Sequence, residues 1–193
     1  MRILVVYAHP VETSYAAALH AKSVATLRRK HEVDDCDLYA EDFNPVMSRQ
    51  ERIDYHTPGV NQLNVKPWVD RLKAAEGLLF CFPVWNMGMP AMMKGFMDKV
   101  FLPGVSFDLT PEGGFIPRLH NISRFGVVCT YGGDRFRTYL MGDPPRRYLK
   151  RSMRMLCKPG TGCDYIALYD MNHTKPGPRE AFLNKVERRL SRW

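Results

Sequence analysis

Short apolar runs alternate with longer amphipathic segments along almost the whole chain. Runs that are apolar throughout predict strands buried on both faces of a sheet, and amphipathic segments of helical period predict helices that cover those faces. The predicted strands span residues 2–8, 31–38, 77–82, 123–130 and 164–169. The second strand is polar on one side, so we expect it at an edge of the sheet.

Helices are predicted between the strands. Thr13 or Ser14 is a suitable N-cap for the first helix, and proline begins two of the others. The helices span residues 15–30, 67–75, 90–101, 135–157 and 178–192, while 44–65 and 102–118 are loop-like, the former with a short helical piece at 49–55. Strands that alternate with helices form a parallel sheet covered on both faces, and five strands suit the order 2-1-3-4-5. We expect one three-layer α/β domain over residues 1–193.

Composition narrows the class of protein. The 193 residues are 45% hydrophobic and 25% charged, which is typical of soluble globular proteins. No apolar run approaches the roughly 20 residues of a membrane span, and the apolar start is too short for a secretion signal, so we expect a cytoplasmic protein. The net charge of +8 comes largely from two clusters, residues 146–154 and 185–192. Their helical spacing indicates solvated helix faces, and without a nucleic-acid-binding motif we expect no nucleic-acid partner.

The cysteines indicate buried thiols rather than a metal site. There are five, an odd number, with no CxxC pair. Cys81 and Cys129 lie inside apolar runs, where a free thiol acts as a small hydrophobe. Because zinc needs a clustered set of ligands, we expect no metal site.

Candidate chemistry gathers in three loops that follow the first, third and fourth predicted strands. In an open α/β sheet these carboxyl ends meet at one edge, where ligands usually bind. The loops are His9 to Ser14, Pro83 to Met87, and Thr130 to Gly133. The first can hold an anion through hydroxyls and free amides at a helix start, although any capped helix looks the same. The second offers a flat apolar wall for a planar heterocycle, and the glycines of the third let backbone amides approach its edge.

Several common functional classes lack their motifs in this chain. No G-x-G-x-x-G sequence follows the first strand, so a dinucleotide held in the Rossmann manner is disfavoured. A Walker sequence is absent, which argues against nucleotide triphosphatases. No G-x-S-x-G elbow occurs either, which argues against α/β-hydrolases.

The loops and their neighbours resemble one flavoprotein family. The shared motifs are Tyr7-Ala8-His9-Pro10, Asp37-Leu38-Tyr39, Phe43-Asn44-Pro45, Phe82-Pro83 through Met89-Pro90-Ala91, Lys94-Gly95, Asp98 to Phe101, and Thr130-Tyr131-Gly132-Gly133. From Arg2 to about Asp143 the chain resembles the NAD(P)H quinone oxidoreductases and the related flavoproteins that regulate potassium efflux, which have a flavodoxin-like fold. The resemblance implies a bound flavin, reduced by NAD(P)H, that passes a hydride to a quinone-like acceptor in a ping-pong exchange. It also implies a homodimer with the site at the subunit interface.

Site residues follow from the resemblance by position. His9, Thr13, Ser14, Tyr15 and Ala16 would flank the flavin phosphate. The isoalloxazine would lie against Pro83, Val84, Trp85, Asn86 and Met87, with its pyrimidine side at Thr130, Tyr131, Gly132 and Gly133. The amides of the two glycines would meet negative charge that develops on the ring. Arg135, Arg137 and Arg146 are candidates for the phosphates of the donor.

The sequence also departs from the family pattern. Ala16 stands where mammalian quinone reductases have an asparagine, so one polar contact to the flavin phosphate is missing. Tyr139 is the candidate for the catalytic tyrosine, one residue beyond the match, and Met141 occupies the place of the histidine. The chain is shorter at its carboxyl end than those enzymes, which favours FMN over FAD.

Two other functions compete with a free oxidoreductase. One is a regulatory flavoprotein that docks on a membrane potassium-efflux transporter, an idea supported by the positive charge and by the family link. The other is a flavodoxin-type electron carrier. Such carriers are usually strongly acidic, so this basic chain argues against that function.

Overall fold

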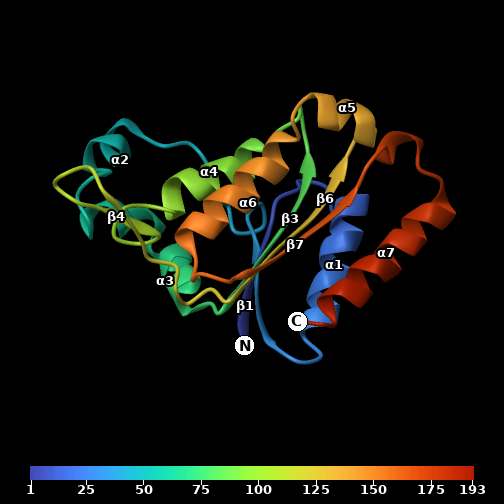
Figure 1. Cartoon of the computed structure of the whole chain (residues 1–193), viewed down its shortest axis with the longest axis horizontal. Coiled ribbons are helices and arrows are strands. Elements are labelled where there is room, and N and C mark those ends of the chain that lie inside the picture. Colours follow the sequence, from blue (N-terminus) through green and yellow to red (C-terminus); the bar gives the residue numbers. More distant parts are fainter.

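Five parallel strands form the central sheet of the computed structural model, which describes residues 1–193 (Figure 1). Along the sheet the order is β2-β1-β3-β6-β7. The strands are β1 (Arg2–Tyr7), β2 (Glu32–Asp37), β3 (Gly77–Val84), β6 (Arg124–Tyr131) and β7 (Gly162–Leu168). Counting only these five, the order is 2-1-3-4-5, which confirms the predicted flavodoxin-like topology.

Helices cover both faces of the sheet (Figure 1). One face carries α1 (Tyr15–Leu27) and α7 (Pro176–Leu190), which lie side by side, and the other carries α3 (Lys66–Ala74), α4 (Ala91–Val100) and α6 (Pro144–Leu156). Two hydrophobic cores result. In β1, Ile3 and Val5 pack towards α1 and α7, whereas Leu4 and Val6 pack towards the other three helices. From Ile3 to Tyr7, β1 is therefore an unbroken run of buried, largely apolar residues, because both of its faces are covered.

Two excursions leave the sheet on the side of α3, α4 and α6. The first contains α2 (Arg49–Asp54) and a 3₁₀ helix, η1 (Val60–Val65). The second contains an antiparallel hairpin of β4 (Phe107–Leu109) and β5 (Phe115–Pro117), where the sequence predicted only a loop. Strands of three residues bounded by proline and glycine give too short an alternation to identify. The Asn61 amide joins the two excursions, because it donates to the carbonyls of Tyr55 and Pro103.

The predicted helix 135–157 is wrong as a single element. It is divided into α5 (Arg135–Leu140) and α6 by Gly142 and Asp143, which have left-handed backbones with φ of 81° and 46°. Left-handed residues end a helix, and Pro144 at the first position of α6 begins a new one. None of the helices combines the length and the apolar composition that crossing a membrane requires.

All five cysteines are free, and four of them are fully buried. Burial raises the pKa of Cys129 and Cys157 to about 12, so both remain thiols at neutral pH. These side chains fill the core as small hydrophobes.

Candidate functional site

A cavity of about 390 Å³ opens where β1, β3 and β6 end, at the carboxyl edge of the sheet. The three predicted loops all contribute to it. Of the fourteen predicted cofactor-binding residues, those that line the cavity are His9, Ser14, Tyr15, Ala16, Pro83, Val84, Trp85, Asn86, Thr130 and Gly132. The register explains the convergence, because β3 and β6 pair up to Val84 and Tyr131 and therefore end together.

The first loop presents unused amides at the start of α1. The Ser14 hydroxyl caps the helix by accepting from the Ala17 N–H at 3.1 Å. The N–H groups of Tyr15 and Ala16 donate no hydrogen bond within the chain, as expected for the first turn of a helix. Free amides at the positive end of a helix dipole attract anions such as phosphate.

Tyr15 is fixed in place by the first turn of α7. Its hydroxyl donates to the Arg179 carbonyl at 2.6 Å. Burial raises the pKa of Tyr15 to about 12, although Arg179 opposes the shift, so the side chain is neutral. The Arg179 guanidinium in turn donates to the Met171 carbonyl at 3.3 Å, which ties α7 to the cavity rim.

The second loop is a tight turn with a strained backbone. Trp85 and Gly88 exchange two backbone hydrogen bonds, at 3.0 and 2.9 Å. The two residues between them are left-handed, with φ of 48° at Asn86 and 58° at Met87. This is the geometry of a type I′ turn, which normally takes asparagine and glycine. Left-handed backbone at a residue such as methionine costs about 1–2 kcal/mol and is a feature of ligand sites.

The turn also creates one wall of the cavity. Trp85 is 43% exposed, a high value for so large an apolar side chain. Its ring meets the His9 ring edge-on, with centroids 5.7 Å apart. His9 Nδ1 lies 3.0 Å from the Val11 amide nitrogen and 3.2 Å from the Val11 carbonyl oxygen, so the loop backbone fixes the orientation of the ring. A flat indole ring and an adjacent imidazole therefore border the cavity above the turn.

The third loop brings backbone close to the cavity. The amides of Gly132 and Gly133 donate no hydrogen bond within the chain. A Cβ at Gly132 would lie 3.1 Å from the Asn172 side chain, and one at Gly133 would lie 3.3 Å from the Met87 methyl group. Both positions therefore disfavour a side chain, and both amides are available to a ligand edge.

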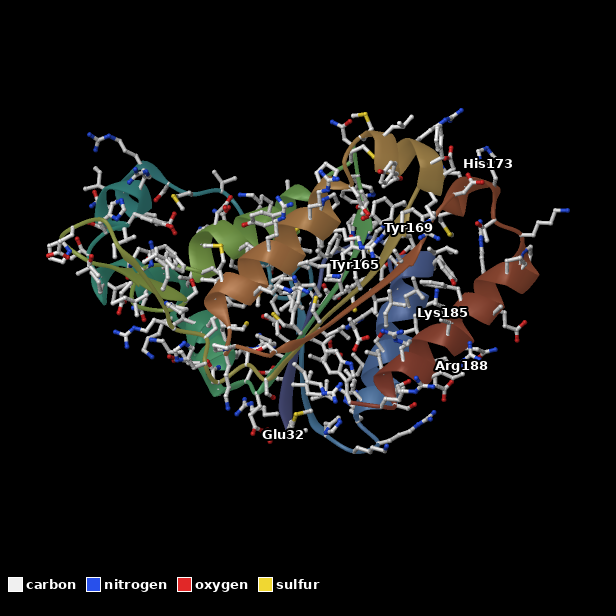
Figure 2. All side chains as sticks on the ribbon, in the orientation of Figure 1. Glu32, Tyr165, Tyr169, His173, Lys185 and Arg188 are labelled. Carbon is white, nitrogen blue, oxygen red and sulfur yellow. The ribbon has the colours of Figure 1, made fainter.

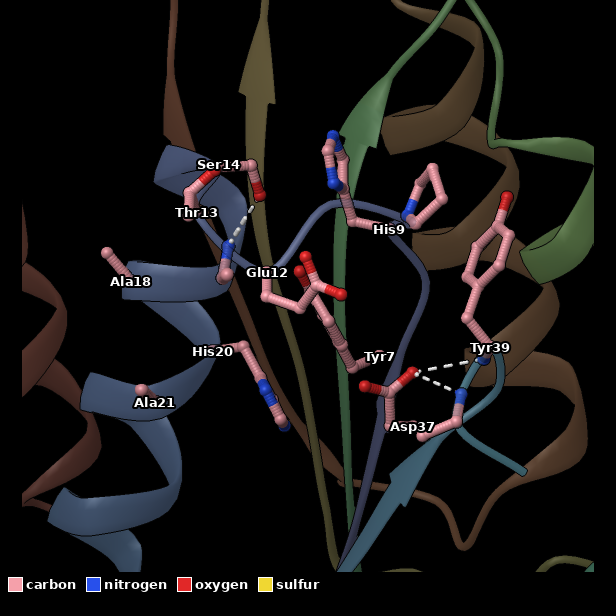
Figure 3. A pocket seen from close by; sticks show the side chains of 13 residues that line it. Tyr7, His9, Glu12, Thr13, Ser14, Ala18, His20, Ala21, Asp37 and Tyr39 are labelled. Carbon is pink, nitrogen blue, oxygen red and sulfur yellow. Dashed lines mark hydrogen bonds between the residues drawn. The ribbon is translucent and has the colours of Figure 1, made fainter. Parts of the chain in front are cut away.

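Five predicted residues lie elsewhere. Thr13 lines a neighbouring cavity (Figure 3), and Met87 and Gly133, which lie close to each other, do not line this one. The Tyr131 side chain is buried on the α6 side of the sheet, where its hydroxyl bonds to Asp143 and Tyr165, so only its backbone remains near the rim. Tyr139 is 71% exposed on α5 and does not line the cavity.

Two lining residues were missed by the sequence analysis. Met171 and Asn172 belong to a short 3₁₀ helix, η2 (Met171–His173), that follows β7. The Asp170 N–H donates to the Gly133 carbonyl at 2.9 Å and holds this segment against the third loop. The sequence did indicate the position of these residues. They follow the fifth parallel strand, so they lie at the same carboxyl edge of the sheet as the three predicted loops.

Comparisons with known proteins agree with this geometry. An uncharacterized NAD(P)H oxidoreductase, YcaK, from Escherichia coli K12 is 31% identical over 90% of this chain and 82% of its own. FMN-dependent NADH:quinone oxidoreductase 1 of Bradyrhizobium diazoefficiens is 32% identical over 45% of this chain and 42% of its own. The crystal structure of Smu.1420 from Streptococcus mutans UA159 covers 100% of both chains, with 27% identity and a TM-score of 0.86.

A family model settles the wider classification. The model described as "Flavodoxin-like fold" matches residues 1–190, which is nearly the whole chain. The sheet order and the position of the cavity agree with that match. The chain belongs to the flavodoxin-like fold family, whose relatives include NAD(P)H oxidoreductases.

Proposed function

We propose that the protein is an FMN-dependent NAD(P)H oxidoreductase that reduces quinones or similar acceptors. The observation that carries the proposal is the cavity of about 390 Å³, which has free backbone amides at both ends and an exposed tryptophan between them. The relatives named as NAD(P)H and FMN-dependent NADH:quinone oxidoreductases support the same chemistry. The volume is within the range of small-molecule sites.

The residues present fit a flavin phosphate at α1. The Tyr15 and Ala16 amides would hold it, together with the Ser14 hydroxyl. Ala16 adds no side-chain donor, and no lysine or arginine lines the cavity. Phosphate would therefore be bound by backbone amides and the helix dipole.

The other two loops would hold the ring system. Trp85 and the turn after it form a flat wall, and the Gly132 and Gly133 amides are free to donate to ring oxygen and nitrogen atoms. A bound flavin would supply the hydride chemistry, as cofactors do in this class of enzyme. The chain contributes position, exclusion of water on one face of the ring, and donors where negative charge develops. Because only one face of the bound ring would be open, the electron donor and the acceptor would have to bind there in turn, which is a ping-pong order.

A homodimer is part of the proposal. Large apolar side chains of α5 and the residue after it are exposed, namely Phe136, Tyr139, Leu140 and Met141. A second subunit would cover such side chains, and it would bring Tyr139 of one copy beside a cavity. We expect sedimentation velocity to give twice the mass of the chain. If the dimer places Tyr139 beside a cavity, Tyr139→Phe should lower kcat.

The visible spectrum of the purified protein, after incubation with FMN and desalting, tests the proposal. We expect one bound flavin per chain, FMN on chromatography of the heat-released cofactor, and steady NAD(P)H oxidation with menadione. Gly132→Val should weaken FMN binding, because the new side chain meets Asn172. Gly162→Val is the control, since nothing lies within 4 Å of a Cβ there. A colourless wild type that ignores FMN and FAD in titrations would refute the proposal.

A further inference from the structure

Strand β7 forms one edge of the sheet, and its outer side pairs with no other element of the chain. Its only strand partner is β6, over Gly162–Leu168. Outside that ladder its backbone makes no hydrogen bond within the chain. In Figure 1, β7 runs between α6 on one side and α7 on the other. The outward N–H and C=O groups of the strand are therefore open to a second extended chain.

The two edges of the sheet differ in their protection against another strand. Natural edge strands are commonly blunted by charged residues, by proline or by a bulge. At the opposite edge, four of the six residues of β2 are acidic. In β7 the one charged residue is Asp164, whose carboxylate already accepts from Arg189 and from the Trp193 indole. Strand β7 therefore lacks the usual protection, and its open edge needs another explanation.

One flank of this edge is a row of cations on α6. Arg146, Lys150 and Arg154 follow one another at intervals of four residues, and the helix contains no acidic residue. The side chains of Cys163 and Tyr165 face the same helix. The Arg146 guanidinium lies over the Tyr165 ring, 5.6 Å from its centroid. Burial raises the pKa of Cys163, and the charges of all three cations oppose that shift.

This row is unfavourable for the helix that carries it. Like charges four residues apart on a helix repel each other, and α6 has no carboxylate that could relieve the repulsion. An anion bound along the row would remove that cost. The arrangement therefore favours a ligand with several negative charges spaced along β7.

The other flank is a cationic hollow on α7. Its volume is about 220 Å³, and it is lined only by Lys185, Arg188, Arg189 and Arg192. The ion pair between Arg189 and Asp164 places the hollow next to β7. Other ion pairs of α7 use only Glu187, so three of the four cations have no carboxylate partner. Lys185 and Arg188 are labelled on α7 in Figure 2, where Tyr165 marks β7.

Both features together narrow the choice of partner. A second copy of this chain is disfavoured, because pairing β7 with its own copy would bring four cationic flanks together on molecules of net charge +8. The phosphates of a membrane or a nucleic acid could meet the cations, but they offer no donors to the outward carbonyl groups of β7. An extended peptide supplies backbone donors and acceptors, and acidic side chains supply the charge.

We propose that the edge of β7 is a docking site for an extended segment of a partner protein, rich in glutamate and aspartate, which adds a further strand to the sheet. Side chains of an added strand alternate between its two faces, so its carboxylates would meet α6 at one position and α7 at the next. Main-chain hydrogen bonds would position the segment, and the cations would select an acidic one. None of the cations on the two flanks lines the flavin cavity, so the proposal is independent of the proposed function.

A fluorescent, end-blocked peptide of about eight residues, composed of glutamate, valine and threonine, tests the proposal on the full chain. We expect binding in fluorescence anisotropy that weakens as the salt concentration rises. Two N-methylated forms of the peptide distinguish strand addition from charge attraction, because methyl groups on alternate residues remove the donors along one edge only. One form should bind about tenfold more weakly than the parent peptide, and the other should bind like the parent. Equal binding of the two forms would refute strand addition.

Charge-reversal variants test the flanks. Lys150→Glu combined with Lys185→Glu reverses one cation on each side of β7 and should weaken peptide binding by about tenfold. Arg49→Glu combined with Lys73→Glu is the matched control, because it changes the net charge equally at exposed positions of α2 and α3. The control should bind the peptide like the wild type. Equal binding by the two double variants would overturn the proposal.

Hydrogen exchange of the wild type gives a reading that does not depend on any substitution. Bound peptide should slow the exchange of the outward amides of β7 by about tenfold or more, because they gain acceptors. Absence of peptide binding, or binding without a change in β7, would overturn the proposal. Tighter binding of anionic vesicles or of single-stranded DNA, abolished by the same pair of lysine substitutions, would show that phosphate is the ligand and would also overturn it.

Discussion

The hydroxyl of Tyr131 donates to the carboxylate of Asp143 at 2.7 Å, and this contact joins the end of β6 to the junction between α5 and α6. The same carboxylate accepts from Tyr169 at 3.3 Å, and Tyr131 also shares a 2.5 Å hydrogen bond with Tyr165. Tyr165 and Tyr169 come from β7 and the residue just after it, on the side of α6 (Figure 2). Three tyrosines and one aspartate therefore support the strand end that carries the Gly132 amide.

Asp143→Ala should destabilise the protein by about 2–3 kcal/mol, because two tyrosine hydroxyls lose a charged acceptor. Asp143→Asn should cost less, since asparagine keeps an oxygen acceptor and tolerates the left-handed backbone at this residue. The measurement is the free energy of unfolding in urea. Tyr169→Phe removes only the longer hydrogen bond and should fall between Asp143→Asn and the wild type. Equal stability of Asp143→Ala and the wild type would show that the cluster is not a support.

Gly95→Ala should be the most damaging methyl insertion in the chain. A Cβ there would lie 2.3 Å from the Pro45 carbonyl oxygen and 2.4 Å from the Pro45 Cβ, so the loop before α2 would have to move. The same loop is fixed by Lys99, which donates to the carbonyls of Asn44 and Val46. Forced overpacking of this kind costs about 3 kcal/mol or more.

Gly177→Ala is the matched control for that experiment. Nothing lies within 4 Å of a Cβ at Gly177, which is in the first turn of α7. The added methyl meets no other element, and the ring of Pro178 offsets the helix propensity of alanine, so this variant should stay close to the wild type in stability. Thermal unfolding followed by circular dichroism compares the two variants, and a Gly95→Ala protein as stable as Gly177→Ala would contradict the close packing.

The topology was predictable because the two-sided burial of this sheet is visible in single segments. Strand β1 is apolar at consecutive positions, which is incompatible with a solvent-facing side. The division between α5 and α6 was not recognised, although Gly142 followed by Pro144 and Pro145 is a signal for the end of one helix and the start of another. The hairpin of β4 and β5 has three residues per strand, which is below the length at which alternation is informative.

The location of the candidate site could be predicted because the ends of the strands could be predicted. The three loops follow apolar runs, and parallel strands bring such loops together. Tyr131 shows the limit, because strand β6 includes it and the alternation of side chains turns its ring into the core while Thr130 faces the cavity. Asn172 shows a second limit of sequence-based prediction. It lies beside Gly132 because of the course of the chain after β7, which the sequence pattern does not reveal.

The left-handed turn before α4 gives a third prediction. Met87→Val should destabilise the protein by about 1–2 kcal/mol, because a β-branched residue tolerates the φ of 58° poorly. Met87→Gly should be neutral or stabilising by a few tenths of a kcal/mol to 1 kcal/mol, since glycine adopts this backbone without strain. Urea unfolding of the flavin-free protein measures both. If the two variants behave alike, side-chain packing rather than backbone strain governs the position.

The buried ion pair between Lys99 and Glu51 predicts a pH dependence of stability. Lys99 is buried, its ammonium lies 3.0 Å from the Glu51 carboxylate, and the Ser48 N–H donates to the same carboxylate at 2.7 Å. Burial would raise the pKa of Glu51, but the hydrogen bonds from Ser48 and Lys99 outweigh it and hold the pKa below the ordinary value of 4.5.

A carboxyl group with a lowered pKa in the folded state stabilises that state above its unfolded pKa. The contribution should therefore be complete above about pH 5 and should disappear as the pH falls through the lowered value. Glu51→Gln should lose this stability at neutral pH and show a shallower decline in acid, so that the two unfolding curves converge once the pH has fallen below the lowered pKa of Glu51. Glu112→Gln, which changes an exposed carboxylate, should follow the wild type throughout. Parallel curves for Glu51→Gln and the wild type from pH 7 to 3 would mean that the ion pair contributes no pH-dependent stability.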